Sequence, residues 1–288
     1  MASNLNDKNL DLLINRALAI EDEMALDADA LGFMARAMVQ ATLPHSKVAG
    51  NEFTRKNGNY SLTILSPSSI GLPYGSVPRL LLAWVTTEAV KTKSRELELG
   101  DSLSGFMREL DLVPTGGRWG SISRLKEQTK RLFASSITAI HEQGDGTQII
   151  NQTLADKAVF WWHPSDPNQT TLWKSSISLT ETFYREIVDR PVPIDMRAIK
   201  ALKKSPMALD IYTWLTYRMS YLKKPTAIPW SSLAMQFGSN YSRLTDFRVA
   251  FLGELKKVVT VYGGVQVEVS PTGLLVKPSL THIGKRDK

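Results

Sequence analysis

The stretch PRLLLAWVTTEAVKTKSRELELGDSLSGFMRELDL, residues 78–112, contains the pattern that decides the fold. Its apolar residues recur at helical spacing as far as Lys93, and Pro78 suits a first helical turn, where its missing N–H costs little. RELEL then alternates like a short strand, and Asp101 or Ser102 can cap a second helix. The stretch therefore predicts helix, strand and helix in that order.

The residues that follow complete the pattern of a winged helix-turn-helix. The turn DLVPTGGRWG (111–120) leads into a third helix, SISRLKEQTKRLFASSI (121–137), which runs into the apolar TAI (138–140). In EQGDGTQII (142–150) the Gly-Asp-Gly is a hairpin-turn signal between two strand-like runs, so we expect the wing there. This order predicts an α+β fold, mainly helical, with small antiparallel sheets.

The same order recurs nearer the C-terminus. The segments are SPMALDIYTWLTYRMSYL (205–222, helix), TAIPW (226–230, strand), SSLAMQFG (231–238, helix), YSRLTDFRVAFLGELKKV (241–258, helix) and VTVYGGVQVEVSPTGLLVKP (259–278, hairpin). The tripeptide SRL opens both third helices, at 123–125 and 242–244, which indicates an internal duplication. We therefore predict two tandem winged-helix domains, 51–190 and 191–288, after an N-terminal helical or partly disordered appendage, 1–50.

The remaining segments carry weaker signals. Residues 8–40 have helical spacing and predict one or two helices, whereas 45–59 collect Gly, Asn and charge and predict a loop or linker. Residues 60–65 predict a short strand. Between the domains we expect a surface loop at 166–170, strand-like alternation around Ile177 and Leu179, and then a helix.

The charge balance favours a polyanionic partner. The chain has 35 Lys and Arg against 28 Asp and Glu, a net charge of +7. Residues 1–50 hold four basic and seven acidic residues, a charge of −3, so the remainder carries +10. Absence of cysteine excludes disulfides and thiolate chemistry, and neither a secretory signal nor an apolar run of about 18 residues stands out. We therefore expect a cytoplasmic protein.

Signatures of an enzyme of DNA metabolism are missing from the sequence. There is no G-x-x-x-x-G-K-[ST] loop for ATP, and the four histidines, His45, His141, His163 and His282, are too scattered to form a metal-binding pair. A rolling-circle nickase needs such a pair beside a nucleophilic tyrosine. We expect no catalytic residue, no cofactor and no metal.

The first long helix has a face suited to the major groove. At 100° per residue, Ile122, Leu125, Thr129, Leu132 and Phe133 fall on one face, which must be core, and Ser121, Arg124, Gln128, Arg131 and Ser135 fall on the opposite face. Arg can bond guanine bidentately and Gln can do so with adenine. The alternative is a polar face that is merely solvated.

The second long helix has a less basic outward face. Its core stripe is Leu244, Phe247, Phe251, Leu255 and Val258, which leaves Ser242, Arg243, Asp246, Val249, Gly253 and Lys257 outward. Asp246 either accepts from a cytosine or pairs with Arg243, and we favour the salt bridge. The predicted DNA-binding residues of both helices and their flanks are Arg118, Ser121, Ser123, Arg124, Gln128, Arg131, Asn240, Tyr241, Arg243, Lys257 and Lys277.

Three runs carry a family resemblance. GLPYGSVPRLLLAWVTTEAVKTKSRELELGDSLSGFMRELDL (71–112), GGRWGSISRLKEQTKRLF (116–133) and FYREIVDRPVPIDMRAIKALKKSPMALDIYTWLTYR (183–218) resemble the plasmid-encoded RepA replication initiators, and the likeness extends over roughly 60–280. The N-terminal 50 residues resemble nothing we can place.

The resemblance implies a protein that binds directly repeated double-stranded origin sites, called iterons, and helps to open the duplex. It implies host initiator and helicase as partners, copy control through homodimers, and repression of the protein's own promoter. A winged-helix transcriptional repressor without an initiation role is the alternative. The resemblance also implies that the second long helix dominates specificity, whereas charge favours the first, and the sequence leaves this open.

Overall fold

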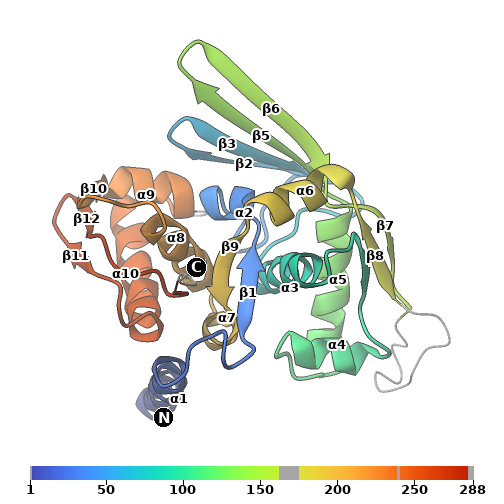
Figure 1. Cartoon of the computed structure of the whole chain (residues 1–288), viewed down its shortest axis with the longest axis horizontal. Helices are drawn as coiled ribbons and strands as arrows, with labels where there is room; N and C mark the ends of the chain where they lie inside the picture. The colour runs from blue at the N-terminus through green and yellow to red at the C-terminus, as the bar shows by residue number, and fades with distance from the viewer. Residues whose placement is uncertain (1, 162–174, 239–240, 285–288) are drawn as a thin grey trace. The chain divides into compact units, whose positions relative to one another are not determined.

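The computed structural model describes residues 2–161, 175–238 and 241–284 (Figure 1). The chain forms two compact units. Residues 35–191 make up the central unit, and residues 1–34 together with 192–288 make up the terminal unit. Both are α+β, and every strand pairing among the described residues is antiparallel.

The central unit contains the predicted helix, strand, helix and helix. They are α3 (Ser76–Thr92), β4 (Glu96–Glu98), α4 (Leu103–Glu109) and α5 (Ser121–Phe133). Helix α3 is buried along most of its length, with Leu80, Leu81 and Leu82 at most 2% exposed. Ser102 caps α4, because its hydroxyl accepts from the backbone N–H of Gly105 at 3.2 Å. The local signals in this stretch and the observed elements therefore agree, except at the end of α5. The helix was predicted to reach Ile137, but it ends at Phe133 because Ser136 and Ile137 pair as part of a strand.

The predicted position of the wing is wrong. The Gly-Asp-Gly turn does join two strands, β5 (Ser136–Gln143) and β6 (Gly146–Thr153), but they belong to a four-stranded sheet of order β2-β3-β5-β6. Strand β4 pairs instead with β8 (Ser176–Leu179), and β8 pairs with β7 (Ala155–Val159). The hairpin beside the three helices is thus β7–β8, because β5 takes β3 as its partner.

Strands β2 (Glu52–Asn57) and β3 (Tyr60–Leu65) explain why β5 pairs with β3 and not with β4. Leu62 and Ile64 of β3 are fully buried, and Ile64 lies opposite Ile137 of β5. The strand predicted at 60–65 is confirmed, but 52–57 had been predicted as loop. Gly58, at φ 58°, allows the tight turn between β2 and β3. In the order β2-β3-β5-β6, the polar strand β2 lies at the edge of the sheet.

Two helices complete the central unit. Helix α6 (Glu181–Asp189), where a helix was predicted, is capped by Thr180 and packs on α3. Glu186 of α6 accepts from the backbone N–H of Ala37 in the short α2 (Arg36–Gln40) at 3.3 Å and from Gln152 of β6 at 2.8 Å. These bonds attach α2 and the four-stranded sheet to the helical core. The loop predicted at 166–170 lies outside the described residues.

The terminal unit repeats the same order of elements. It contains α8 (Pro206–Met219), β10 (Thr226–Pro229), α9 (Trp230–Phe237), α10 (Leu244–Val261), β11 (Val267–Val269) and β12 (Gly273–Val276). Its sheet order, β10-β12-β11, is the order of β4-β8-β7 in the central unit. The predicted recurrence is therefore present in the topology. Helix α10 runs three residues beyond its predicted end at Val258, so the hairpin begins later than expected.

The N-terminal residues divide differently from the predicted appendage 1–50. Helix α1 (Ala2–Glu21) packs on α10 and on α7 (Met196–Leu202), and it buries Ala17 and Ile20. Strand β1 (Leu31–Met34) pairs with β9 (Val192–Asp195), so the helical prediction for 31–34 is wrong. The backbone of β9 supplies a partner that helical spacing alone cannot reveal. Residues 35–50 belong to the central unit.

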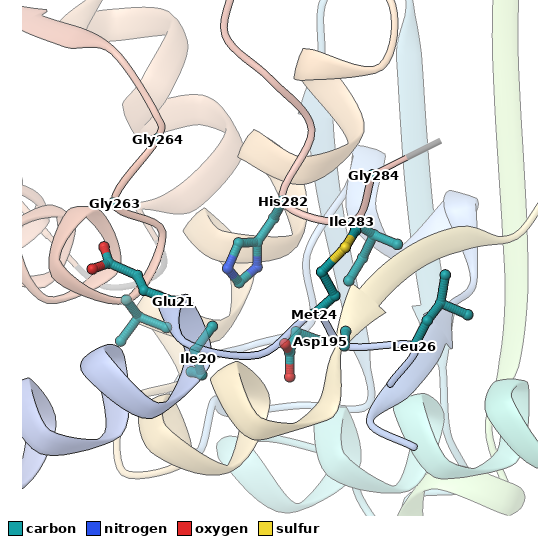
Figure 2. A pocket seen from close by; sticks show the side chains of 12 residues that line it. Ile20, Glu21, Met24, Leu26, Asp195, Gly263, Gly264, His282, Ile283 and Gly284 are labelled. Atoms are coloured by element: carbon teal, nitrogen blue, oxygen red, sulfur yellow. The ribbon is translucent and has the colours of Figure 1, made fainter. Parts of the chain in front are cut away.

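A small pocket marks where the C-terminal segment meets the rest of the terminal unit (Figure 2). It encloses about 220 Å³ and is lined by Asp195, His282 and the end of α1. The Tyr212 hydroxyl accepts from the backbone N–H of Asp195 at 2.9 Å and also shares a hydrogen bond of 2.7 Å with Nδ1 of His282. Burial lowers the pKa of His282, so the site favours the neutral form of the ring.

Candidate nucleic-acid interface

The outward face predicted for α5 is largely covered by its own unit. Gln128 is only 2% exposed, and its Oε1 accepts from the backbone N–H of Tyr74 at 2.9 Å. The prediction that Gln128 faces a DNA groove is therefore wrong. The covering segment, residues 71–74, lies just before α3 and more than 50 positions upstream in the chain.

Arg131 is also engaged within the central unit. Its side chain is 13% exposed; the guanidinium donates to the Leu72 carbonyl at 3.0 Å and to Glu127 at 2.8 Å, and it stacks on Tyr74 at 5.5 Å. Ser135, one helical turn further on, is buried and donates to the Arg131 carbonyl at 2.7 Å. The C-terminal half of the predicted reading face is thus structural.

Two serines at the start of α5 hold the turn that precedes it. The Ser121 hydroxyl donates to the Val113 carbonyl at 2.6 Å and accepts from the Thr115 N–H at 2.9 Å. The Ser123 hydroxyl donates to the Gly117 carbonyl at 2.8 Å. These bonds fix the turn between α4 and α5, although Ser123 remains exposed.

The exposed basic residues at this end of the central unit are Arg118 and Arg124. Arg118 stacks at 5.1 Å on Trp119, which is 82% exposed and is the most exposed tryptophan described in the chain. Burial lowers the pKa of Lys126 on the flank of α5. The interface that α5 can offer is therefore its N-terminal end and the turn before it.

Helix α10 presents an uncovered face. Val249 is 74% exposed, and Ser242, Thr245 and Gly253 are also exposed, with open space around the position a Cβ would take at Gly253. Thr245, Val249 and Gly253 follow one another at intervals of four, so they share one side of the helix, and Ser242 lies two residues before the helix begins. No described segment covers this face as residues 71–74 cover α5.

The predicted pairing of Arg243 with Asp246 is confirmed. Arg243 Nε and Nη2 donate to the two carboxylate oxygens of Asp246 at 2.8 and 2.9 Å, and the arginine side chain is 74% exposed. The prediction that Leu244 belongs to the core is wrong, because the helix begins at this residue and leaves it 48% exposed. The buried stripe starts at Phe247 and continues as predicted through Phe251, Leu255 and Val258.

The other candidates of the terminal unit are dispersed. Tyr241 is 42% exposed with its ring 5.8 Å from that of Phe247, and partial burial raises the pKa of its hydroxyl. Lys257 bonds Glu254 at 2.8 Å and Lys277 pairs with Glu268. Asn240 lies outside the described residues. The open face of α10 thus combines a guanidinium, hydroxyls and an apolar surface, groups that can bond base edges and contact a thymine methyl.

Two further observations bear on function. Among the described residues, no group of three or more His, Asp or Glu side chains is placed to hold a metal ion. Within the same part of the chain, no helix combines the length and apolarity that crossing a bilayer requires.

Comparison with known proteins identifies the family. The model of the plasmid-encoded RepA protein family matches residues 72–231, more than half of the 288 residues. No curated relative matches the sequence. Among solved structures, the selenomethionine derivative of domains 2 and 3 of RctB is similar in fold, with a TM-score of 0.55 and 11% identity, covering 84% of this chain and 98% of that one. The matched stretch includes α3 to α5 and extends into the first two residues of α9, and the chain is a member of the plasmid-encoded RepA family of plasmid replication proteins.

Proposed function

We propose that this protein initiates plasmid replication by binding directly repeated double-stranded sites in the plasmid origin. Family membership over residues 72–231 is the observation that carries the proposal. In it, each unit acts as a winged helix, built from α3, α4, α5 and the β7–β8 hairpin in the central unit. In the terminal unit the same roles fall to α8, α9, α10 and the β11–β12 hairpin. The protein itself performs no catalysis and recruits the host initiator and helicase.

In this proposal α10 reads bases and α5 supports the backbone contact. A reading helix must reach the floor of the major groove, which requires a face free of other protein segments. The face of α10 around Val249 meets this condition, whereas that of α5 is covered at Gln128 and Arg131. Arg243 then contacts a guanine or a phosphate at the start of α10, and Arg124 binds phosphate.

The difference between the two faces supports a directly repeated site. Because α5 and α10 offer unlike surfaces, a monomer has no internal two-fold axis, and it should prefer an asymmetric sequence repeated head to tail. A homodimer would prefer an inverted repeat. One protein could therefore bind iterons as a monomer and repress its own promoter as a dimer.

Sequence-specific binding is tested by fluorescence anisotropy on repeats from the DNA upstream of the gene and on a scrambled duplex, over a range of salt concentrations. We expect the repeats to bind about 10³-fold more tightly, with a steep salt dependence. Arg243→Ala should reduce this ratio about tenfold or more, and Arg124→Ala should weaken both duplexes alike. Arg185→Ala is the matched control, since Arg185 is a 72% exposed arginine on α6. Equal binding of both duplexes would refute the proposal.

An initiator is distinguished from a plain repressor by its effect on the neighbouring DNA. Permanganate footprinting of a supercoiled origin should show unpaired thymines in the AT-rich tract only when the protein is bound. A protein that binds the repeats tightly and leaves the tract paired would be a repressor.

A further inference from the structure

A groove of about 630 Å³ lies in the terminal unit, apart from the open N-terminal half of α10. Leu10 and Leu13 of α1, Leu202 of α7 and Ala208 of α8 contribute apolar surface to it. Leu202 and Ala208 are buried, whereas Leu10 is 52% exposed. The floor of the groove is therefore made of buried apolar residues, and most of its exposed apolar surface comes from the wall that α1 provides, where Leu12 is also 47% exposed.

The charges around this groove are all of one sign. Six basic residues line it: Arg16, Lys200, Lys203, Lys204, Lys256 and Lys257. None of the described lining residues is acidic. The neighbouring carboxylate of Glu254 bonds Lys257 at 2.8 Å and so offsets part of the charge of one of the six. The groove as a whole remains strongly cationic.

Specific bonds hold α1 against the helix pair that forms the floor. Arg16 Nη1 donates to the Lys200 carbonyl at 3.0 Å, and Lys204 Nζ donates to Oδ1 of Asn9 at 2.9 Å. Ala17 and Ile20 are buried on the inner side of α1. Because these contacts join the walls, the groove is a formed feature of the terminal unit.

We propose that this groove binds an acidic amphipathic helix of a partner protein. An amphipathic helix places apolar residues on one face and charges beside them, which matches an apolar floor rimmed by cations. The six cations lie on α1, on α7 and the turn that follows it, and on α10, so one small anion would meet only some of them. A DNA backbone would meet the charges but would leave the leucines of α1 against phosphate.

An acidic segment near the N-terminus of a second copy of this chain is a weaker candidate for the groove, because part of its apolar surface is already buried. The stretch from Glu21 to Ala30 is acidic, but its alanines Ala25 and Ala30 already pack with Ile283 in a small core cluster. It therefore has little apolar surface left to place on the floor of the groove. The proposal does not rest on the proposed DNA function, because the part of the uncovered α10 face around Val249 lies outside the groove; the two surfaces adjoin at Gly253, which lines the groove.

The probe is a fluorescein-labelled helical peptide of about five turns, with leucines at i, i+3, i+4 and i+7 and glutamates on both flanks. A second peptide has lysine in place of every glutamate. By anisotropy on the full chain, we expect micromolar binding of the acidic peptide and at least about tenfold weaker binding of the basic one. The double variant Lys203→Glu, Lys204→Glu should weaken binding of the acidic peptide about tenfold or more.

The matched control is Lys223→Glu with Lys224→Glu, an equal change of charge at two exposed residues of the same unit outside the groove. Leu10→Ser, at an exposed position, tests the apolar wall without changing charge and should also weaken the peptide. If the two charge variants weaken the peptide equally, or the basic peptide binds as well as the acidic one, the proposal is refuted. The proposal is also refuted if the groove variant binds the peptide normally but binds origin DNA more weakly than the control variant does. In that case the proposed function still stands.

Discussion

Replacing Gln128 with Met tests whether other residues of the central unit cover half of the α5 face that was predicted to contact DNA. Methionine is similar in length but cannot accept the hydrogen bond from the Tyr74 N–H, which the glutamine accepts at 2.9 Å in a site that is 2% exposed. Leaving that N–H unpaired costs about 1–3 kcal/mol. For a folding unit of this size each kcal/mol lowers Tm by about 2–4 °C, so we expect Tm to fall by about 2–12 °C.

The assay pairs thermal unfolding with DNA binding at a temperature where both proteins are folded. The Gln128→Met variant should keep the same ratio of affinities for the repeats and for scrambled DNA as the unmodified protein. The matched variant Arg124→Ala, at an exposed position one helical turn away, should leave Tm within about 1–2 °C and weaken DNA binding. If Gln128→Met keeps its Tm and loses discrimination between the repeats and scrambled DNA, the placement of this residue is incorrect.

Three further changes follow from other contacts. Arg79→Met should destabilise the central unit by about 3–5 kcal/mol, because the 4% exposed guanidinium donates to the carbonyls of Leu43, Pro44 and Gly75; urea unfolding measures this. Gly253→Ala should stabilise α10 by about 0.5–1 kcal/mol, since a methyl group there meets open space, and an unchanged or lower midpoint in urea would count against it. Burial lowers the pKa of His282 below its usual 6.5, so the unfolded chain binds a proton first and stability falls as pH drops below about 6.5, by at most about 1.4 kcal/mol per pH unit. His282→Asn should flatten this dependence between pH 7.5 and 5.5.

Local signals predicted the helices well, because each helix carries its own evidence. The proline at the start of α3, the Ser102 cap and the apolar spacing of α8 and α10 all lie within the element they define. The Arg243 to Asp246 bond is equally local, since three residues separate its partners on one helix. Such features depend on few residues outside the segment in which they are read.

Strand partners could not be predicted in the same way. The Gly-Asp-Gly turn correctly indicated a hairpin, but nothing in residues 136–153 shows whether the neighbour will be β3 or β4. Strand β1 likewise exists only because β9, about 160 residues away, pairs with it. A strand is stabilised by hydrogen bonds to another strand, so its own sequence indicates that it can form a strand but not which strand it will pair with.

The helical wheel of α5 failed for a related reason, and that failure bears on function. A wheel correctly shows which residues lie opposite the apolar stripe, but it equates the opposite side with solvent. Residues 71–74 occupy that side. Gln128 and Arg131, which are suited to base contacts, form hydrogen bonds with the backbone of this segment instead. The same two residue types that can bond adenine and guanine are equally able to bond a buried peptide group. Polar residues on a helix therefore become evidence for DNA reading only once the face is known to be uncovered, as it is on α10 and is not on most of α5.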